Sequence, residues 1–283
     1  MAPEATSPIK YSVIITLHDR DPLDLAMTYK QLVKAIGPRT DVEIIFGYDF
    51  EPGDFPHVED MTENLAEAMG DKAQTFYWNT IKERPQTWNL YGHCNPVGIS
   101  NQCMDRVRGL NTVWLQSDTM VNPFFFLRMD NLCDDDGALE TVWCSRVIDR
   151  DSCAEFCGIT RPAPFMWCCA HKTTSERMDL NLLNGLGYDD NDWMARMAIL
   201  YGSITIDLGH LAIHQTHGEV TVIGQIASGK AYEPGTEIAW KNSTEYMQKK
   251  WGGIPFDQKT LKFKIMDISD YIVMEYVSRL DGK

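Results

Sequence analysis

The chain has 283 residues and a formal net charge of −14, from 40 acidic and 26 basic residues. A chain of this length buries roughly three quarters of its unfolded surface, so it can fold without disulfide staples. Its acidic balance would repel a phosphate backbone and disfavours nucleic acid as a partner. No signal peptide opens the sequence, and no apolar run approaches the ~18 residues of a membrane span, so we expect a cytoplasmic protein.

Residues 10–120 alternate between strand and helix patterns. The apolar run Tyr11–Leu17 predicts a buried strand, and Asp21-Pro22 predicts the cap and first turn of a helix that Gly37-Pro38 ends. The same alternation then predicts a strand at Val42–Phe46, a helix ending at Met69, a strand at Thr75–Trp78, a helix through Arg108 and a strand at Thr112–Leu115. Such alternation is typical of a parallel α/β sheet that binds a nucleotide.

The pattern changes after residue 120. It predicts a short helix at Phe124–Met129, strands at Leu139–Val147, Phe165–Cys169, Ser203–Asp207 and Leu211–His214, and helices at Asp190–Leu200 and Ser243–Trp251, the last one capped by Asn242-Ser243-Thr244. We expect a catalytic domain over 1–220, with a nucleotide-binding half (10–120) and an acceptor and metal half (121–220). Residues 221–283 are expected to form a C-terminal helix and arm that pack on this domain.

Acidic residues and histidines follow the predicted elements in a suggestive order. Asp118 stands at the carboxyl end of a strand, where open α/β sheets place ligands. The acidic cluster Asp189-Asp190-Asn191-Asp192 opens a helix, and a run containing His210, His214 and His217 comes later. A carboxylate, a carboxylate cluster and then histidines would suit a metal-assisted site for a nucleotide sugar.

These motifs together resemble the inverting, family-2-like glycosyltransferases of the GT-A fold. The matching segments are Tyr11 to Arg20, Gly98-Ile99-Ser100-Asn101 with Arg106 and Gly109, Leu115-Gln116-Ser117-Asp118, and Asp189 to Arg196. Gln116 departs from the family pattern by replacing the first acid of Asp-x-Asp, and Asp189 replaces the usual glutamate.

The resemblance implies a GT-A-like nucleotide-binding sandwich with a mostly parallel central sheet. It also implies a metal-dependent, inverting transfer of a sugar from a UDP- or GDP-type donor to a hydroxyl acceptor. Mn2+ or Mg2+ would be held by Asp118 and by His214 or His217, and Asp190 would act as the base beside Asp189 and Asp192. Donor contacts would come from Thr16, His18, Asp19, Arg20, Asp49, Asn101, Arg106 and Ser117, and Trp193 would stack on the acceptor.

Simpler roles and other functions stay open from the sequence. Acids at a helix start are ordinary capping, and most aromatic residues and histidines of a chain lie in its core. The first alternative function is a catalytically inactive sugar-nucleotide-binding protein of the same fold. The others are a viral-type enzyme that glycosylates a modified nucleobase and a zinc hydrolase centred on the three histidines.

Overall fold

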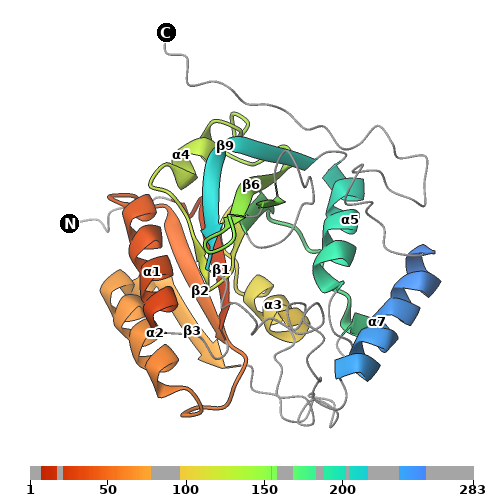
Figure 1. Ribbon diagram of the computed structural model, residues 1–283. Coiled ribbons are helices and arrows are strands. Elements are labelled where there is room, and N and C mark those ends of the chain that lie inside the picture. The colour runs from red at the N-terminus through yellow and green to blue at the C-terminus, as the bar shows by residue number, and fades with distance from the viewer. Residues whose placement is uncertain are drawn as a thin grey trace.

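The computed structural model describes residues 8–17, 22–77, 96–153, 155–157, 168–182, 188–201, 204–215 and 236–252. These residues form one curled, nine-stranded sheet in the order β3-β2-β1-β4-β8-β6-β9-β5, with β7 paired to β6 (Figure 1). The strands are β1 (Tyr11–Leu17), β2 (Val42–Tyr48), β3 (Ala73–Tyr77), β4 (Asn111–Leu115), β5 (Thr119–Met120), β6 (Val142–Asp149), β7 (Glu155–Cys157), β8 (Cys168–Lys172) and β9 (Ile204–His214).

The strand directions confirm the mostly parallel α/β sheet. Strand β1 is parallel to β2 and β4, β2 is parallel to β3, and β6 is parallel to β9. Strand β8 is antiparallel to both β4 and β6, while β5 and β7 are antiparallel to β9 and β6. Six of these nine strands therefore run in one direction, and their carboxyl ends lie at one edge of the sheet.

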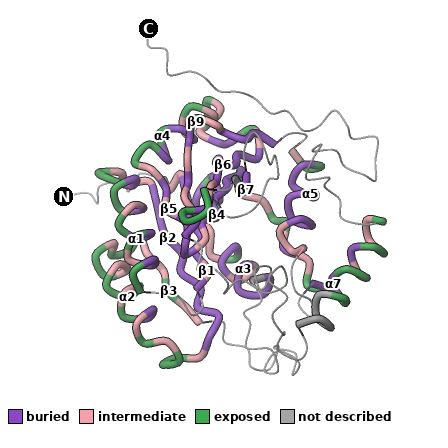
Figure 2. The backbone as a smooth tube through the Cα atoms, in the orientation of Figure 1, coloured by how far each residue is buried: buried purple, intermediate pink, exposed green. Residues whose placement is uncertain are grey.

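Helices cover both faces of the sheet. They are α1 (Pro22–Ile36), α2 (Pro56–Met69), α3 (Pro96–Met104), α4 (Phe125–Asp130), α5 (Asp189–Tyr201) and α7 (Thr236–Trp251), with short 3-10 turns η1 (Gly70–Lys72) and η3 (Leu180–Leu182). Helices α1 and α2 lie on one face, whereas α3 and α5 lie on the other, with α7 outside α5 (Figure 1). The central strands between these layers are buried along most of their length (Figure 2).

A glycine allows helix α3 to approach the sheet closely. A Cβ atom added to Gly47 on β2 would lie 2.7 Å from the Ile99 side chain and 2.8 Å from the Cys103 sulfur. Both neighbours belong to α3 and are fully buried, so they have little room to move. Glycine at this position therefore sets how close α3 packs against β2.

The later half of the chain departs from the sequence prediction most clearly in strand β9. The predicted strands Ser203–Asp207 and Leu211–His214 form the single strand β9, whose pairing with β6 shifts after Asp207. Three residues, 208–210, are bulged out where Ser145 pairs with Asp207 and Arg146 pairs with Leu211. The bulge contains the glycine at 209, which made the segment read as a turn between two strands.

Two helix boundaries were also wrong. Helix α3 ends at Met104 and not at Arg108. Helix α7 begins at Thr236, so Asn242-Ser243-Thr244 lies inside the helix and not at its cap. Ser243 is only 1% exposed, so it lies on the buried face of this helix. Within the described residues, no helix combines the length and apolar character that crossing a membrane requires.

Candidate active site

The centre of the carboxyl edge carries Asp49, predicted to contact the nucleotide, and Asp118, predicted to bind the metal. Asp49 directly follows β2, and its backbone N–H donates to Leu17 O, the last residue of β1, at 2.8 Å. Asp118 follows β4, the neighbour of β1 on the other side. Because β2, β1 and β4 are adjacent and parallel, Asp49 and Asp118 lie along the same edge. His18, Asp19 and Arg20, which follow β1, fall outside the described residues.

Asp118 and His214 come together because the short strand β5 pairs with the end of the long strand β9. Strand β5 begins directly after Asp118, and Thr119 lies opposite His214 in its pairing with β9. The backbone N–H of Gln215, the residue after His214, donates to Asp118 O at 2.8 Å and also holds these two segments together. His214 Nε2 consequently lies 3.5 Å from Asp118 Oδ1, and the two residues are only 7% and 4% exposed.

The spacing of this pair fits two ligands of one divalent ion. Two donors about 2.1 Å from a common ion in an octahedral shell lie about 3 Å apart. The observed distance of 3.5 Å between a carboxylate oxygen and an imidazole nitrogen is close to that value. No group of three or more His, Cys, Asp or Glu side chains within the described ranges could hold a metal ion. His217, the other predicted ligand, lies outside the described residues.

Asp149 is a neighbour of this pair that the sequence did not single out. It ends β6 directly opposite His214 in the pairing of β6 with β9. Its Oδ1 accepts hydrogen bonds from the backbone N–H groups of Asp151 and Ser152 at 3.0 and 2.6 Å, and from the Ser152 hydroxyl at 2.7 Å. This carboxylate therefore caps the loop after β6 and fixes the backbone beside the histidine. A strand-ending aspartate followed by Arg-Asp-Ser was the available sequence signal.

Helix α5 directs its acidic first turn towards the same edge. At its far end, the Tyr201 hydroxyl donates to Lys172 O at 2.5 Å, and Lys172 pairs with Asn111 at the start of β4. The helix therefore runs against the direction of β4, so Asp189 and Asp190 lie towards the end of the sheet where Asp118 is found. Both carboxylates are half-buried, and the main chain before them has the left-handed φ of 67° at Tyr188.

The surroundings of the first turn of α5 raise the pKa of its carboxyl groups, which suits a general base. Partial burial, and after it the negative charge of Asp189, raises the pKa of Asp190 to about 7. Burial likewise raises the pKa of Asp189 to about 6, with a smaller contribution from the charge of Asp192. A carboxylate with a raised pKa accepts a proton more readily than an ordinary aspartate does at neutral pH.

Two residues predicted for this site are structural instead. Asp192 is fully buried and accepts hydrogen bonds from Arg196, Lys250 and Trp251, so it has no access to a substrate. Trp193 is also fully buried, and its ring lies against Trp114 of β4 with a centroid distance of 6.1 Å. The Trp193 ring has no exposed face for an acceptor sugar. It packs α5 against β4, the strand that precedes Asp118.

Two of the remaining predicted donor contacts, Asn101 and Arg106, have protein partners in the described structure. Asn101 uses both amide atoms on the backbone of Met178, accepting from its N–H at 2.7 Å and donating to its carbonyl at 3.0 Å. Arg106 lies over the Phe76 ring and donates to Gln102 O. Ser117 is 1% exposed, whereas Thr16 near the end of β1 is half-buried. Their predicted contacts with the donor remain predictions.

His210 does not join the other histidines in a metal cluster. It is fully buried, its Nδ1 lies 2.6 Å from the Ser145 hydroxyl, and its ring packs against Phe125 and Trp143. Burial lowers the pKa of His210 to about 4, so the ring is neutral. A zinc site that uses all three histidines is incompatible with this packing.

The fold and the arrangement of its edge define a structural class, the GT-A-like fold of glycosyltransferases. No protein-family model and no curated protein matches the sequence. Among solved structures, S. aureus TarS matches with a TM-score of 0.51 and 11% identity, over 86% of this chain and 44% of that one. GalNAc-T7, in a structure with UDP, GalNAc and Mn2+, matches with a TM-score of 0.53 and 12% identity, over 75% of this chain and 45% of that one.

These comparisons confirm the expected resemblance at the level of the fold. The chain spans less than half the length of either protein, and the identities are low. Fold alone does not determine an activity, which must be argued from the site.

Proposed function

We propose that the protein is a metal-dependent glycosyltransferase that moves a sugar from a nucleoside diphosphate sugar to a hydroxyl acceptor with inversion. The observation that carries this proposal is the buried pair of Asp118 and His214, 3.5 Å apart, at the carboxyl edge of the sheet. Asp190 lies towards the same edge with a raised pKa. A cation site and a base on one side of a nucleotide-binding sheet are the parts that such a transfer needs.

A uridine diphosphate donor is the form that we favour. The structural neighbour GalNAc-T7 was solved with UDP, GalNAc and Mn2+, which supports this choice by fold-level analogy. Asp49, 8% exposed beside the end of β1, would accept hydrogen bonds from a base edge or from ribose hydroxyls. We therefore assign donor recognition to the edge formed by β1, β2 and β4.

Asp118 and His214 are the proposed ligands of Mn2+ or Mg2+. A bound divalent ion would contribute several kcal/mol of stabilisation to the negative charge that develops on the departing diphosphate. Oxygen and imidazole donors together suit Mn2+, and an acidic chain holds a diphosphate best through such an ion. Gln116 stands in place of a further acid, so the diphosphate oxygens would complete the coordination shell.

Asp190 is the proposed general base. It would accept the proton of the acceptor hydroxyl as that oxygen attacks the anomeric carbon from the face opposite the diphosphate. One direct displacement of this kind inverts the configuration at the anomeric carbon. The α5 helix holds Asp190 in place through the buried contact of Trp193 with Trp114.

A donor panel tests the proposal. The purified protein would be incubated with UDP- and GDP-sugars, Mn2+ and a mixture of simple hydroxyl acceptors, and release of nucleoside diphosphate would be measured. We expect release from at least one donor in the presence of Mn2+ and none after chelation. If no donor is turned over by a protein that is shown to be folded, the proposed activity is wrong.

The replacement of an acid by Gln116 favours a second candidate, a sugar-nucleotide-binding protein without turnover. Both candidates predict donor binding that depends on Asp118. They differ in Asp190→Asn, which should abolish transfer in an enzyme but leave binding unchanged in either case. Calorimetric binding of UDP with Mn2+, measured beside the turnover assay, separates the two.

A further inference from the structure

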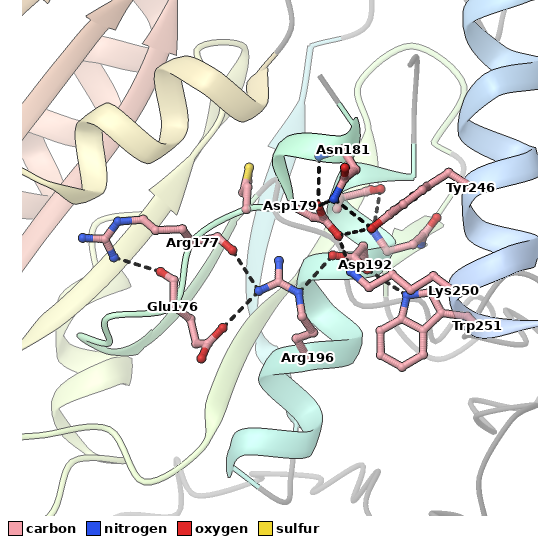
Figure 3. Close-up of polar contacts among 12 residues, drawn as sticks. Glu176, Arg177, Asp179, Asn181, Asp192, Arg196, Tyr246, Lys250 and Trp251 are labelled. Carbon is pink, nitrogen blue, oxygen red and sulfur yellow. Dashed lines mark hydrogen bonds and ion pairs between the residues drawn. The ribbon is translucent and has the colours of Figure 1, made fainter. Parts of the chain in front are cut away.

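A network of hydrogen bonds and ion pairs links helices α5 and α7 (Figure 3). At its centre is Asp192, a fully buried carboxylate two residues after Asp190. A buried charge is costly unless it is paired and hydrogen-bonded, so the partners of Asp192 fix where the first turn of α5 can lie.

Most of these partners come from the last turn of α7. Lys250 Nζ lies 2.6 Å from Asp192 Oδ1, and the Trp251 indole N–H donates to the same oxygen at 2.7 Å. Arg196, one turn along α5, donates to Asp192 Oδ2 at 2.9 Å. Two of these three side-chain donors therefore come from a helix almost sixty residues further along the chain.

Lys250 also joins this turn to the segment before α5. Its ammonium group lies 2.5 Å from Asp179 Oδ2, and the Tyr246 hydroxyl donates to the same oxygen at 2.5 Å. Burial alone would lower the pKa of Lys250, but hydrogen bonds to Asp179 and Asp192 outweigh it and raise the pKa. The lysine is therefore charged at neutral pH and bridges two carboxylates.

Among the ionisable groups that the structure describes around α5, Lys250 is the cation whose ion pair links α7 to α5. Arg196 pairs with Asp192 and Glu176 and donates to Arg177 O at 2.8 Å, so it holds α5 to the preceding loop. His171, on β8, packs against Trp193 and is neutral, because burial lowers its pKa to about 4. Loss of Lys250 would remove the positive charge that lies between the carboxylates of Asp179 and Asp192.

From this geometry we infer that Lys250 is a positioning residue for the proposed base. It holds the first turn of α5 through Asp192, so that the Asp190 carboxylate keeps its place at the carboxyl edge of the sheet. Helix α7 thereby belongs to the structure that supports the active site and is not an appendage. This inference rests on the proposed function for its effect on turnover, but not for its effect on α5 itself.

The test compares Lys250→Met, which removes the charge at similar length, with Lys250→Arg, which keeps it. Lys249→Met is the matched control, because Lys249 is an exposed neighbour on the same helical turn. We expect Lys250→Met to lower kcat roughly tenfold with donor Kd within about twofold, since a base misplaced by about an ångström loses most of its effect. Lys250→Arg should recover most of kcat, and Lys249→Met should match the wild type.

The pH profile provides a readout that a merely structural role would not move. Removal of a cation beside Asp192 leaves more negative charge near Asp190, so the pKa of the base should rise. We expect the acid limb of kcat to move up by about half a pH unit in Lys250→Met and to return in Lys250→Arg. An unchanged limb and unchanged kcat in a folded Lys250→Met would overturn the inference, as would the same losses in Lys249→Met.

A milder variant and a measurement that needs no turnover test the positioning role independently of the proposed activity. Trp251→Phe removes only the indole N–H from Asp192, so it should produce a smaller loss of kcat in a protein that folds normally. Carboxyl 13C NMR titration of Asp189 and Asp190 should show the upward shift in Lys250→Met even if no donor is turned over. Inactivity of the wild type would therefore refute the proposed function, whereas unshifted carboxyl resonances would refute the positioning role.

Discussion

Neighbouring aspartates on one helical turn have opposite roles in this protein. Asp190 is half-buried with a raised pKa, whereas Asp192 is fully buried and bound by an arginine, a lysine and a tryptophan. They share a residue type and a helix start, and only their surroundings separate them. The same contrast distinguishes His214, beside Asp118, from His210, which is enclosed by Phe125 and Trp143.

Asp190→Asn should separate activity from stability. We expect kcat to fall by about a thousandfold, because the variant cannot accept the acceptor proton. The wild-type rate should rise with pH through an acid limb near 7, the pKa of Asp190.

The same substitution should stabilise the fold at high pH. A carboxyl group whose pKa is raised in the folded state destabilises the fold progressively as the pH rises from its unfolded pKa, about 4, to its folded pKa, and the full cost remains above that value. The variant should therefore be more stable than the wild type at pH 8.5, by about 1–2 kcal/mol, and should lose this advantage as the pH falls towards 4. Urea denaturation at several pH values measures the difference, and an advantage that grows in acid would contradict the assignment.

Removal of the metal or of either ligand should abolish turnover. Chelation is expected to stop the reaction, and Mn2+ should restore it in the wild type but not in His214→Ala or Asp118→Asn. UDP should raise Tm in the wild type only when Mn2+ is present, because UDP binding is expected to require the ion. A ligand that binds only the folded state stabilises that state. His57→Ala, a change on α2, is the control and should keep both responses.

At the scale of the element, the bulge in β9 and the contacts that hold it determine where the site residues lie. The bulge in β9 is held by Arg128 of α4, whose guanidinium makes a two-point pair with Asp207 at 2.8 and 2.5 Å. Trp143 Nε1 and the backbone N–H of Gly209 also donate to Asp207. Strand β9 continues from the bulge to His214. The position of His214 therefore depends on this buried ion pair at the start of the bulge.

Arg128→Leu should weaken both the fold and the metal site. Loss of one partner from a buried ion pair costs about 3–5 kcal/mol, because the remaining charge is left unpaired. We expect a comparable fall in the free energy of unfolding, measured by denaturant titration, and a weaker Tm response to UDP with Mn2+. Arg150→Leu is the control, since that arginine is 39% exposed and its pairs with Asp24 and Asp151 should contribute less than about 1 kcal/mol each.

At the scale of the whole molecule, the buried histidines and the aspartates with raised pKa values have opposite effects on how folding stability changes with pH. Burial lowers the pKa of His171 and of His210 to about 4, so folding becomes less favourable as the pH falls below about 6.5, where unfolded histidine is protonated. The raised pKa values of Asp189 and Asp190 have the opposite sign, because the folded state binds their protons more readily. The net dependence of wild-type stability on pH between 4 and 7 should therefore be shallow.

His210→Asn should reveal one of these opposing contributions. At pH 7.5 the variant should be less stable than the wild type, because it loses ring packing against Phe125 and Trp143. As the pH falls to 4, the wild type loses roughly 2–3 kcal/mol that the variant does not, so the difference should shrink. Thermal unfolding of both proteins across this range measures it, and a constant difference would show that His210 is not held neutral.

Much of the site could be read from local patterns. The end of a buried strand before Asp118 and the acidic start of α5 were visible because apolar period and turn residues mark element ends directly. Trp193 was misassigned because a tryptophan beside acidic residues looks the same whether it faces solvent or the core. Lys250 was missed because its partners Asp179 and Asp192 lie far away in sequence, and Asp149 was missed because its strand neighbour His214 does.

The sequence alone determined the α/β alternation, the strand ends that carry Asp49 and Asp118, and the helix that begins with three acids. Each of these depends on the spacing of neighbouring residues, which local propensity and periodicity govern. Only the tertiary structure decided that β9 is one bulged strand that brings His214 to Asp118, and that α7 holds Asp192. Those outcomes depend on pairings between distant segments, where burial of charge and close packing select a single arrangement.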